Sequence, residues 1–441
     1  MLTQEYLDLS AEILKKLIRF KSVNPPGECL EILNWIKDFL AEEGIEATLH
    51  KTAGDRGVLE ARMEGTDDSL DPFLLGGHVD VVTADEDYWE VDPFAAEVKD
   101  GFIYGRGALD MKCMVAMEMT ALAYIRRNNI PLKRDLLFVV NGDEESSGSL
   151  GAQWYTDTFW QEKKLCAVLN EGVYGMKDKM FKGDFFPVEL SSKHNMKLKL
   201  IARDKPSHGD APRKTSAIIR LTRAVQKLSA HKFPLEINAV LERLFAEIGT
   251  RKKFPENLIL KNLDKGICRM LFDKAIENDR TVNAHCRTTI AVTGLKAGTG
   301  SLNAVPQEAE AILDVRMLPH TDCDDTIDAV KGIVDDAQIT VELISKTFPT
   351  EVSDYKNRAF KLLAASVLEE FPEAVVAPYI CIGGSDAKHF RRYGHNCYGL
   401  IPVLITEDEL DTVHGNNERI SLENLHAGTR VVTNYTLKLC Q

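Results

Sequence analysis

The sequence predicts an α/β protein, with a mixed, mostly parallel sheet flanked by helices and a second, α+β domain inserted into it. Short apolar runs alternate with helical periodicity up to Leu169 and again after Thr347, which is typical of a sheet covered by helices. Between these parts, polar and apolar residues alternate over Leu190 to Ile201, as in strands with one buried face. The length of 441 residues is too great for one ordinary core and predicts two domains, or one large α/β domain with an insertion.

The outer domain is expected to begin with two helices. Apolar residues recur at helical spacing from Leu7 to Ile18 and from Leu30 to Leu40, and the turn-forming string Asn24-Pro25-Pro26-Gly27 separates them. The other elements expected here are strands over Gly57 to Met63, Pro72 to Gly76, Asp135 to Val140 and Ala167 to Leu169, and helices over Met111 to Ile125 and Leu422 to Leu437. We assign residues 1–191 and 347–441 to this domain.

The inserted domain, residues 192–346, is expected to have a ferredoxin-like β-α-β-β-α-β order. The elements expected after its first strand are a helix over Thr215 to Leu228, a strand over Glu308 to Met317, a helix over Asp325 to Asp336 and a strand over Ile339 to Ile344. The stretch from Lys232 to Arg280 fits no regular pattern and receives no assignment.

Composition and charge exclude several classes of partner. A formal net charge of −13 argues against nucleic acid, and the nearest approach to a basic run, Arg251 to Lys253, is interpreted as ordinary surface. Apolar stretches such as Leu136 to Val140 fall short of the roughly 20 residues that span a bilayer, so no membrane partner is expected. The N-terminus mixes charges with apolar residues, unlike a signal peptide, and the nine scattered cysteines contain no CxxC pair. A cytoplasmic location is expected.

Acidic or imidazole side chains follow apolar strands or glycine-rich turns at five places, where open α/β sheets carry their ligand sites. These places are His78 with Asp80, Asp110, the run Asp143-Glu144-Glu145, Glu171 and His414. Each has an ordinary alternative when taken alone, such as a loop histidine, a helix N-cap or a solvated acidic loop. Together they provide what two divalent cations require: a shared carboxylate, one acid and one histidine for each ion, and a spare acid that activates water.

Four strings of residues resemble a known family in order and approximate spacing. They are Gly77-His78-Val79-Asp80-Val81-Val82, Trp89 with Asp92-Pro93-Phe94, Gly105-Arg106-Gly107-Ala108-Leu109-Asp110-Met111-Lys112 and Asp143-Glu144-Glu145. The family is the zinc-dependent aminoacylase and carboxypeptidase family, which includes acetylornithine deacetylase, succinyl-diaminopimelate desuccinylase, aminoacylase and yeast carboxypeptidase S. The resemblance runs from Phe20 to Glu418 and implies a zinc-peptidase-like catalytic domain with an inserted lid and dimerisation domain.

The resemblance implies a role for each residue of this set. The implied metal ligands are His78 and Glu171 on one zinc, Glu145 and His414 on the other, and Asp110 between the two ions, with a cis Asp110-Met111 peptide bond. Glu144 is the implied general base, which takes a proton from the attacking water and later gives it to the leaving amine. Asp80 is implied to orient His78. Cobalt or manganese would also suit carboxylate and imidazole ligands.

Further residues are implied in the inserted domain and beyond it. His208 matches a histidine that, in dimeric relatives, reaches the active site of the neighbouring subunit and stabilises the oxyanion, so a homodimer is expected. Asn303 and Arg316 resemble substrate-binding residues, with the arginine holding a carboxylate. Gly384 and Ser385 resemble a loop near that carboxylate. A loop histidine and a surface salt bridge are the alternatives for His208 and Arg316.

The chain departs from the family's pattern at two places that lie outside the metal set. Cys113 follows Lys112 where many relatives have glycine, and Lys388 stands where arginine is common. The length of the inserted domain and the string Arg287-Thr288-Thr289-Ile290-Ala291-Val292-Thr293 favour the carboxypeptidase S-like branch.

The expected function is cleavage, by two zinc ions, of the amide bond in a short peptide or N-acyl amino acid with a free carboxylate, as in a carboxypeptidase or dipeptidase. An N-acyl-amino-acid deacylase of the acetylornithine deacetylase or desuccinylase type is the alternative, and the two differ in the pocket for the acyl side. From another class, the alternative is a catalytically inactive binding protein of the same fold. The complete set of ligands and base favours the enzyme.

Overall fold

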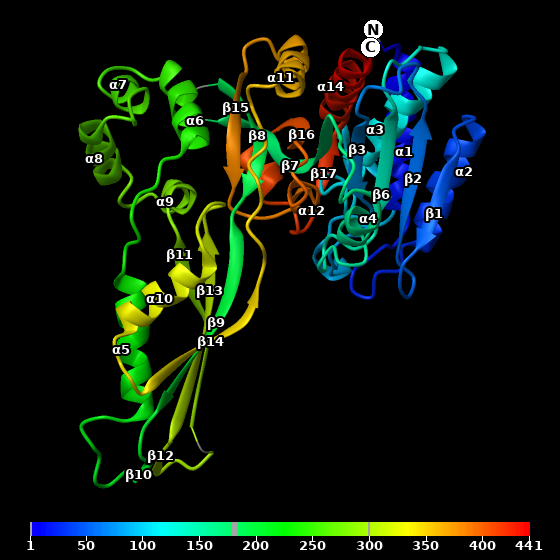
Figure 1. Cartoon of the computed structure of the whole chain (residues 1–441). Helices are drawn as coiled ribbons and strands as arrows, with labels where there is room; N and C mark the ends of the chain where they lie inside the picture. Colours follow the sequence, from blue (N-terminus) through cyan, green and yellow to red (C-terminus); the bar gives the residue numbers. More distant parts are fainter. Residues whose placement is uncertain (1, 179–182, 299) are drawn as a thin grey trace.

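The structure is a computed structural model in which residues 2–178, 183–298 and 300–441 are described. Figure 1 shows two lobes, a larger one built on an eight-stranded sheet and a narrower one built on a four-stranded sheet. Both chain termini lie in the larger lobe (Figure 1).

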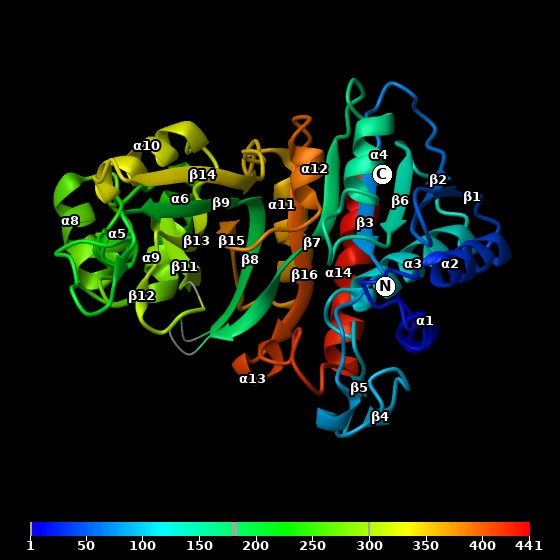
Figure 2. The same ribbon diagram turned by 90° about the horizontal axis from the view of Figure 1, so that it is seen from below.

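The eight-stranded sheet has the order β1-β2-β6-β3-β7-β16-β8-β15. Its strands are β1 (Ala47–Lys51), β2 (Gly57–Met63), β3 (Phe73–His78), β6 (Leu136–Asn141), β7 (Ala167–Asp178), β8 (Gly183–Ser192), β15 (Val375–Cys381) and β16 (Cys397–Ile405). β3 is parallel to β6 and β7, β16 to β7, and β15 to β8, whereas the β1–β2, β2–β6 and β8–β16 pairs are antiparallel. Figure 2 shows β1 and β2 at one end of this sheet and β15 at the other. The predicted mixed, mostly parallel sheet is confirmed.

Helices cover both faces of this sheet, because successive side chains of a strand point to opposite faces. Phe73 and Leu75 of β3 belong to a core cluster that includes α1, α2, α3, α11 and α14, whereas Leu74 belongs to a cluster that includes α4 and α12. These helices are α1 (Gln4–Ile18), α2 (Leu30–Glu42), α3 (Lys112–Arg127), α4 (Ala152–Phe159), α11 (Arg358–Glu370), α12 (Ala387–Arg391) and α14 (Leu422–Cys440). The helices expected at both ends of the chain are thus present.

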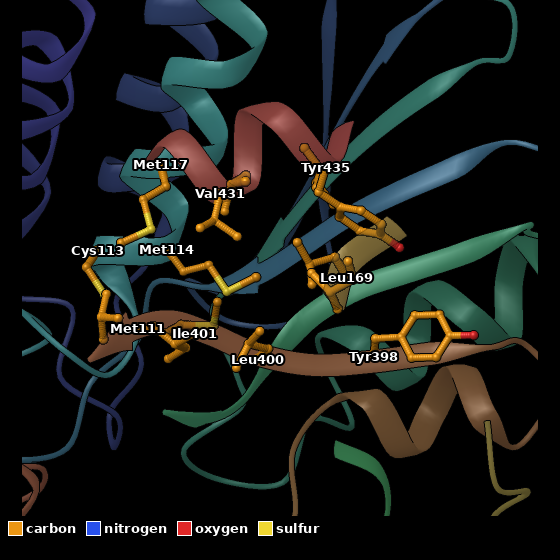
Figure 3. Packing of buried hydrophobic residues seen from close by; sticks show 14 of the residues in the cluster. Met111, Cys113, Met114, Met117, Leu169, Tyr398, Leu400, Ile401, Val431 and Tyr435 are labelled. Atoms are coloured by element: carbon orange, nitrogen blue, oxygen red, sulfur yellow. The ribbon is translucent and has the colours of Figure 1, made fainter. Parts of the chain in front are cut away.

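The central helix α3 is held by dense apolar packing. Figure 3 shows Met114 and Met117 of α3 beside Ile401 of β16 and Val431 of α14, and all four side chains are buried. Burial of one such side chain stabilises the folded state by about 1.5–3 kcal/mol. Because α3 begins at Lys112, two residues after Asp110, this packing also fixes the turn that presents the predicted bridging carboxylate.

The narrower lobe has the predicted β-α-β-β-α-β order. Its antiparallel sheet has the strand order β11-β13-β9-β14. The elements are β9 (His194–Arg203), α5 (Ala217–Ala230), β11 (Thr289–Ala297), β13 (Glu308–Met317), α10 (Cys323–Val334) and β14 (Ile339–Lys346). A separate hydrophobic cluster, with Leu198, Leu221, Leu313 and Val330 among its members, joins the two helices to this sheet.

The unassigned stretch between Lys232 and Arg280 is helical. Its helices are α6 (Ala239–Thr250), α7 (Glu256–Leu260), α8 (Gly266–Ala275) and α9 (Arg280–Cys286). Leu241, Phe245 and Phe272 share the core cluster of the eight-stranded sheet, so these helices pack on the larger lobe although they lie within residues 192–346. The proposed domain boundaries themselves remain a prediction.

The remaining elements are short. They are η1 (Glu86–Tyr88), β4 (Val98–Lys99), β5 (Phe102–Tyr104), β10 (Ser207–His208), β12 (Ala304–Val305), α13 (Glu407–Leu410) and β17 (Arg419–Ser421). β10 pairs with β12 at the far tip of the narrower lobe (Figure 1). Among the helices of the described residues, none combines the length and the apolar character that crossing a bilayer demands.

Candidate active site

Three adjacent strands bring most of the predicted residues to one edge of the sheet. β3 ends at His78, which pairs in register with Asn141, the last residue of the parallel strand β6. The acidic run with Glu144 and Glu145 follows β6, and Glu171 lies on β7, the other parallel neighbour of β3. Because parallel strands end at the same edge, positions far apart in the chain become neighbours there.

The predicted ligands form two groups that share one carboxylate. His78 Nε2 lies 3.1 Å from Glu171 Oε2 and 3.3 Å from Asp110 Oδ1. His414 Nε2 lies 3.1 Å from Asp110 Oδ2 and 3.2 Å from Glu145 Oε1. Within each group, the candidate ligand atoms all lie within 4.8 Å of one another. Asp110 offers one oxygen to each group, and its peptide bond to Met111 is cis, as expected.

The charges of this cluster fit divalent cations. Burial raises the pKa of Glu171 to about 7, and burial together with the Glu171 carboxylate raises the pKa of Glu144 well above its usual value. Buried carboxylates repel one another unless protons or cations relieve them. Two imidazoles and three carboxylates are ligand types that zinc, cobalt and manganese accept. The side chains present therefore fit a pair of such ions, and their roles as ligands remain a prediction.

Asp80 is joined to both groups. Its carboxylate lies 3.4 Å from His78 Nδ1 and accepts hydrogen bonds from the backbone N–H groups of Glu144, at 3.2 Å, and Glu145, at 3.0 Å. Asn24 Nδ2 donates to the same carboxylate at 2.9 Å. Asp80 is completely buried, so solvent does not compete for these bonds. This geometry suits the orienting role predicted for Asp80, and it extends that role to the turn with the predicted base.

Glu418 supports the predicted bridging residue, Asp110, and no sequence pattern indicated this contact. Its carboxylate accepts backbone hydrogen bonds from Gly107, Leu109 and Asp110 at 3.1, 2.8 and 3.0 Å, and it lies 2.6 Å from Arg106 Nη1. Both partners of this ion pair are buried. A glycine-rich turn with inward-pointing N–H groups requires an acceptor, but nothing in the sequence identifies which acid supplies it.

The loop with Gly384 and Ser385 lies beside the cluster. Asp386, the next residue, is completely buried, accepts a hydrogen bond from Asn141 Nδ2 at 2.8 Å and interacts electrostatically with Glu144. Ser385 Oγ is buried and has no hydrogen-bond partner among the described residues. A buried hydroxyl without a partner is suited to receive a polar group of a ligand.

The structure does not bring all predicted site residues together within one chain. His208 is exposed, with Nδ1 3.0 Å from Asp210 Oδ1 and Nε2 3.4 Å from Asn303 Nδ2. His208 and Asn303 therefore lie side by side, but at the tip of the narrower lobe, away from β3 and β7 (Figure 1). Arg316 lies on β13, where its Nε is 3.2 Å from Asp314 Oδ1.

An apolar cavity of about 680 Å³ opens beside the cluster. Near the candidate ligands its wall includes Gly172, the residue after Glu171, and Leu410, four residues before His414. Further away its wall is formed by apolar side chains of β7, β8 and the helices α6 to α9, among them Met176, Phe185, Leu244, Phe245, Ile259 and Phe272. The sequence did not predict this cavity, because the helices that enclose it had received no assignment.

Fold and site together point to a class, namely α/β hydrolytic enzymes with a candidate two-metal ligand set at one edge of a mostly parallel sheet. A model of the family described as Peptidase family M20/M25/M40 matches residues 74–438. The chain belongs to this family. It is a hydrolase of C–N amide bonds of the metallopeptidase type, and the resemblance seen in the sequence is confirmed.

Similar proteins carry several functional names. The N-fatty-acyl-amino acid synthase/hydrolase PM20D1 of Xenopus tropicalis is 32% identical over 368 residues, which cover 82% of this chain and 71% of that protein. The probable carboxypeptidase S-like 2 of Dictyostelium discoideum is 29% identical over 369 residues, 82% of this chain and 70% of that protein. Among solved structures, the M20 family metallo-carboxypeptidase Sso-CP2 from Sulfolobus solfataricus has a TM-score of 0.69 at 22% identity, with 98% of both chains covered, and so shares the fold.

Proposed function

We propose that this chain hydrolyses the amide bond between a long apolar acyl group and an amino acid with a free carboxylate, using two divalent cations, most simply zinc. The observation that carries this proposal is the apolar cavity beside the candidate metal cluster. A wall built largely of aliphatic and aromatic side chains binds a hydrocarbon chain through the hydrophobic effect and offers little to a polar peptide.

The position of the cavity supports this assignment of substrate. Its wall includes Gly172, which follows Glu171 of one candidate metal group. It also includes Leu410, which lies four residues before His414 of the other group. An amide carbonyl placed at the cluster would therefore have its acyl carbons directed into the cavity. The name N-fatty-acyl-amino acid synthase/hydrolase, which several relatives carry, points the same way.

The chain's own residues divide the chemical work between them. His78, Asp110, Glu145, Glu171 and His414 would hold the cations, which would supply the positive charge that acidifies water and polarises the scissile carbonyl. Glu144, held beside both groups by Asp80, accepts the proton of the attacking water and returns it to the leaving amine. Arg316 and Ser385 hold the carboxylate of the amino acid, together with Gly384. Asn303 lies beside His208 at the tip of the narrower lobe, so a contact between Asn303 and the substrate requires the Asn303 of a second copy.

This proposal includes a homodimer. His208 is exposed and lies in a different lobe from the cluster, so an oxyanion-stabilising role within this site requires the His208 of a second copy. A reducing compartment such as the cytoplasm suits the nine cysteines, all of which are free thiols.

A carboxypeptidase or dipeptidase activity is the second candidate. It needs the same cluster and the same grip on a carboxylate, and the similarity to the carboxypeptidase S-like protein favours it. The two candidates differ in what occupies the acyl side of the scissile bond.

Amino acids acylated with acetyl, octanoyl and palmitoyl chains, together with Gly-X dipeptides, separate the two candidates. Each methylene that enters the cavity contributes at most about 0.8 kcal/mol, so kcat/KM should rise by up to roughly fourfold per carbon until the cavity is full. Met176→Trp, which fills part of the cavity, should lower kcat/KM for palmitoyl substrates and leave acetyl substrates unaffected. Faster cleavage of dipeptides than of long-chain substrates would refute the acyl assignment.

A further inference from the structure

The segment of residues 254–271, which includes α7 and most of α8, carries large apolar side chains in contact with solvent. Phe254 is 79% exposed, Ile267 67% and Met270 64%, and Leu258 and Leu271 are also exposed. We call these five side chains the α7–α8 surface. Figure 1 shows both helices at an outer corner of the molecule, beyond α6. Apolar groups gathered in this way mark an interaction surface rather than ordinary protein exterior.

The charge around the α7–α8 surface is opposite to that of the whole chain. Between Arg251 and Lys274 there are seven lysines and arginines but three aspartates and glutamates, in a protein with a net charge of −13. One of the three acids, Asp273, is held in ion pairs by Lys232 and Arg287. Exposed apolar side chains among basic ones are the combination that binds an anionic lipid surface.

The same two helices form part of the wall of the apolar cavity. Ile259 and Leu260 of α7 and Phe272 of α8 line it from the inner side. Glu256 and Ala275 line the cavity and are also exposed, so the cavity reaches the molecular surface beside these helices. A long-chain acyl substrate is an amphiphile that partitions into bilayers, and it would meet the protein at this surface.

We propose that the α7–α8 surface docks the protein on an anionic lipid bilayer, with the apolar side chains at the boundary between headgroups and acyl chains. The lysines and arginines around it contact the anionic headgroups. The supply of substrate from the bilayer to the cavity rests on the proposed function, whereas the docking rests on the surface alone. Docking of this kind differs from the expectation of no membrane partner, because it needs no bilayer-spanning segment and it gives Arg251 to Lys253 a role beyond ordinary surface.

Flotation of the full-length, metal-loaded protein with vesicles tests the docking directly. Vesicles of phosphatidylcholine alone are compared with vesicles that also contain phosphatidylglycerol. We expect binding to the anionic vesicles, weakened by salt, and little binding to the neutral ones. Ile267→Ser combined with Met270→Ser, and Lys253→Glu combined with Lys261→Glu, should each lower binding about tenfold or more. All four residues are exposed, so these variants should fold normally.

Matched controls lie elsewhere on the surface. Leu302→Ser removes an exposed apolar side chain at the tip of the narrower lobe, and Lys163→Glu combined with Lys164→Glu changes two exposed charges near α4. Both controls should bind vesicles like the unaltered protein. Equal loss of binding in controls and α7–α8 variants would overturn the proposal.

Two further outcomes also decide the matter. Absence of vesicle binding by the unaltered protein would overturn the docking. Dissociation of a dimer by the α7–α8 variants in sedimentation, without a change in vesicle binding, would assign the surface to a second copy instead. Hydrolysis of a water-soluble octanoyl amino acid, measured without vesicles, tests the proposed function separately, so failure of one does not imply failure of the other.

Discussion

Glu418→Gln should reveal how far the candidate metal site depends on a residue outside the ligand set. The Glu418 carboxylate accepts three backbone hydrogen bonds from the turn that ends in Asp110, and it is paired with the buried Arg106. An amide retains one acceptor oxygen but brings an N–H₂ group against N–H donors, and it leaves the guanidinium without its charge partner. Loss of one partner of a buried ion pair costs about 3–5 kcal/mol.

Two measurements follow from this geometry. Urea unfolding of the metal-free protein should show a loss of about 3–5 kcal/mol, and competition with a chelating dye should show metal affinity lowered about 10- to 100-fold, because Asp110 loses its support. Glu409→Gln is the matched control: Glu409 is also buried but hydrogen-bonds Thr406 at the start of α13, so its loss should leave metal affinity unchanged. Stability and affinity both unchanged in Glu418→Gln would refute this reasoning.

Three further predictions concern the general base Glu144, the binding of the substrate carboxylate by Arg316, and the buried acid Glu118. Glu144→Ala should lower kcat about 10²- to 10⁴-fold while metal content, measured by mass spectrometry, stays the same; unchanged turnover would remove Glu144 as the base. Arg316→Ala should raise KM about 10- to 100-fold, because the substrate carboxylate loses a charge-assisted contact. The control is Arg203→Ala, which should leave KM unchanged, since Arg203 is an exposed residue of the same lobe that pairs with Glu308. Equal KM values for the two variants would contradict the binding of the carboxylate by Arg316. Burial raises the pKa of the Glu118 carboxyl group well above 4.5. Above about pH 4.5 the unfolded chain releases this proton whereas the folded protein keeps it, so the free energy of unfolding falls as pH rises. Glu118→Met should therefore raise Tm at about pH 8, with a gain that shrinks towards the acid side; a gain independent of pH would count against this explanation.

Regular hydrophobic patterns made much of the fold predictable. The strand over Gly57 to Met63 was placed correctly, and the helix expected over Met111 to Ile125 is α3 over Lys112–Arg127. β7, expected to end at Leu169, continues to Asp178 because it pairs with β16 and then with β8, and pairing partners cannot be identified from one strand's pattern. The helices α6 to α9 were missed although Leu241, Leu244, Phe245 and Ile248 have helical spacing, since loops and short helices interrupt the pattern.

The candidate site was predictable as far as side-chain chemistry reveals it. Histidines and acids after strands and glycine-rich turns predict a metal site, and the structure brings His78, Asp110, Glu145, Glu171 and His414 together. Supporting contacts were not predictable, because Glu418 acts on backbone N–H groups that every residue possesses. The apolar cavity was equally hidden, since its walls come from elements far apart in the chain.

The proposed chemistry requires two cations that share Asp110. Anomalous diffraction at the zinc absorption edge, from crystals grown with zinc, would locate them. We expect two peaks, one about 2.0–2.2 Å from ligand atoms of His78 and Glu171 and the other equally close to Glu145 and His414, with an Asp110 oxygen at the same distance from each. A single peak, or two peaks without Asp110 between them, would contradict it.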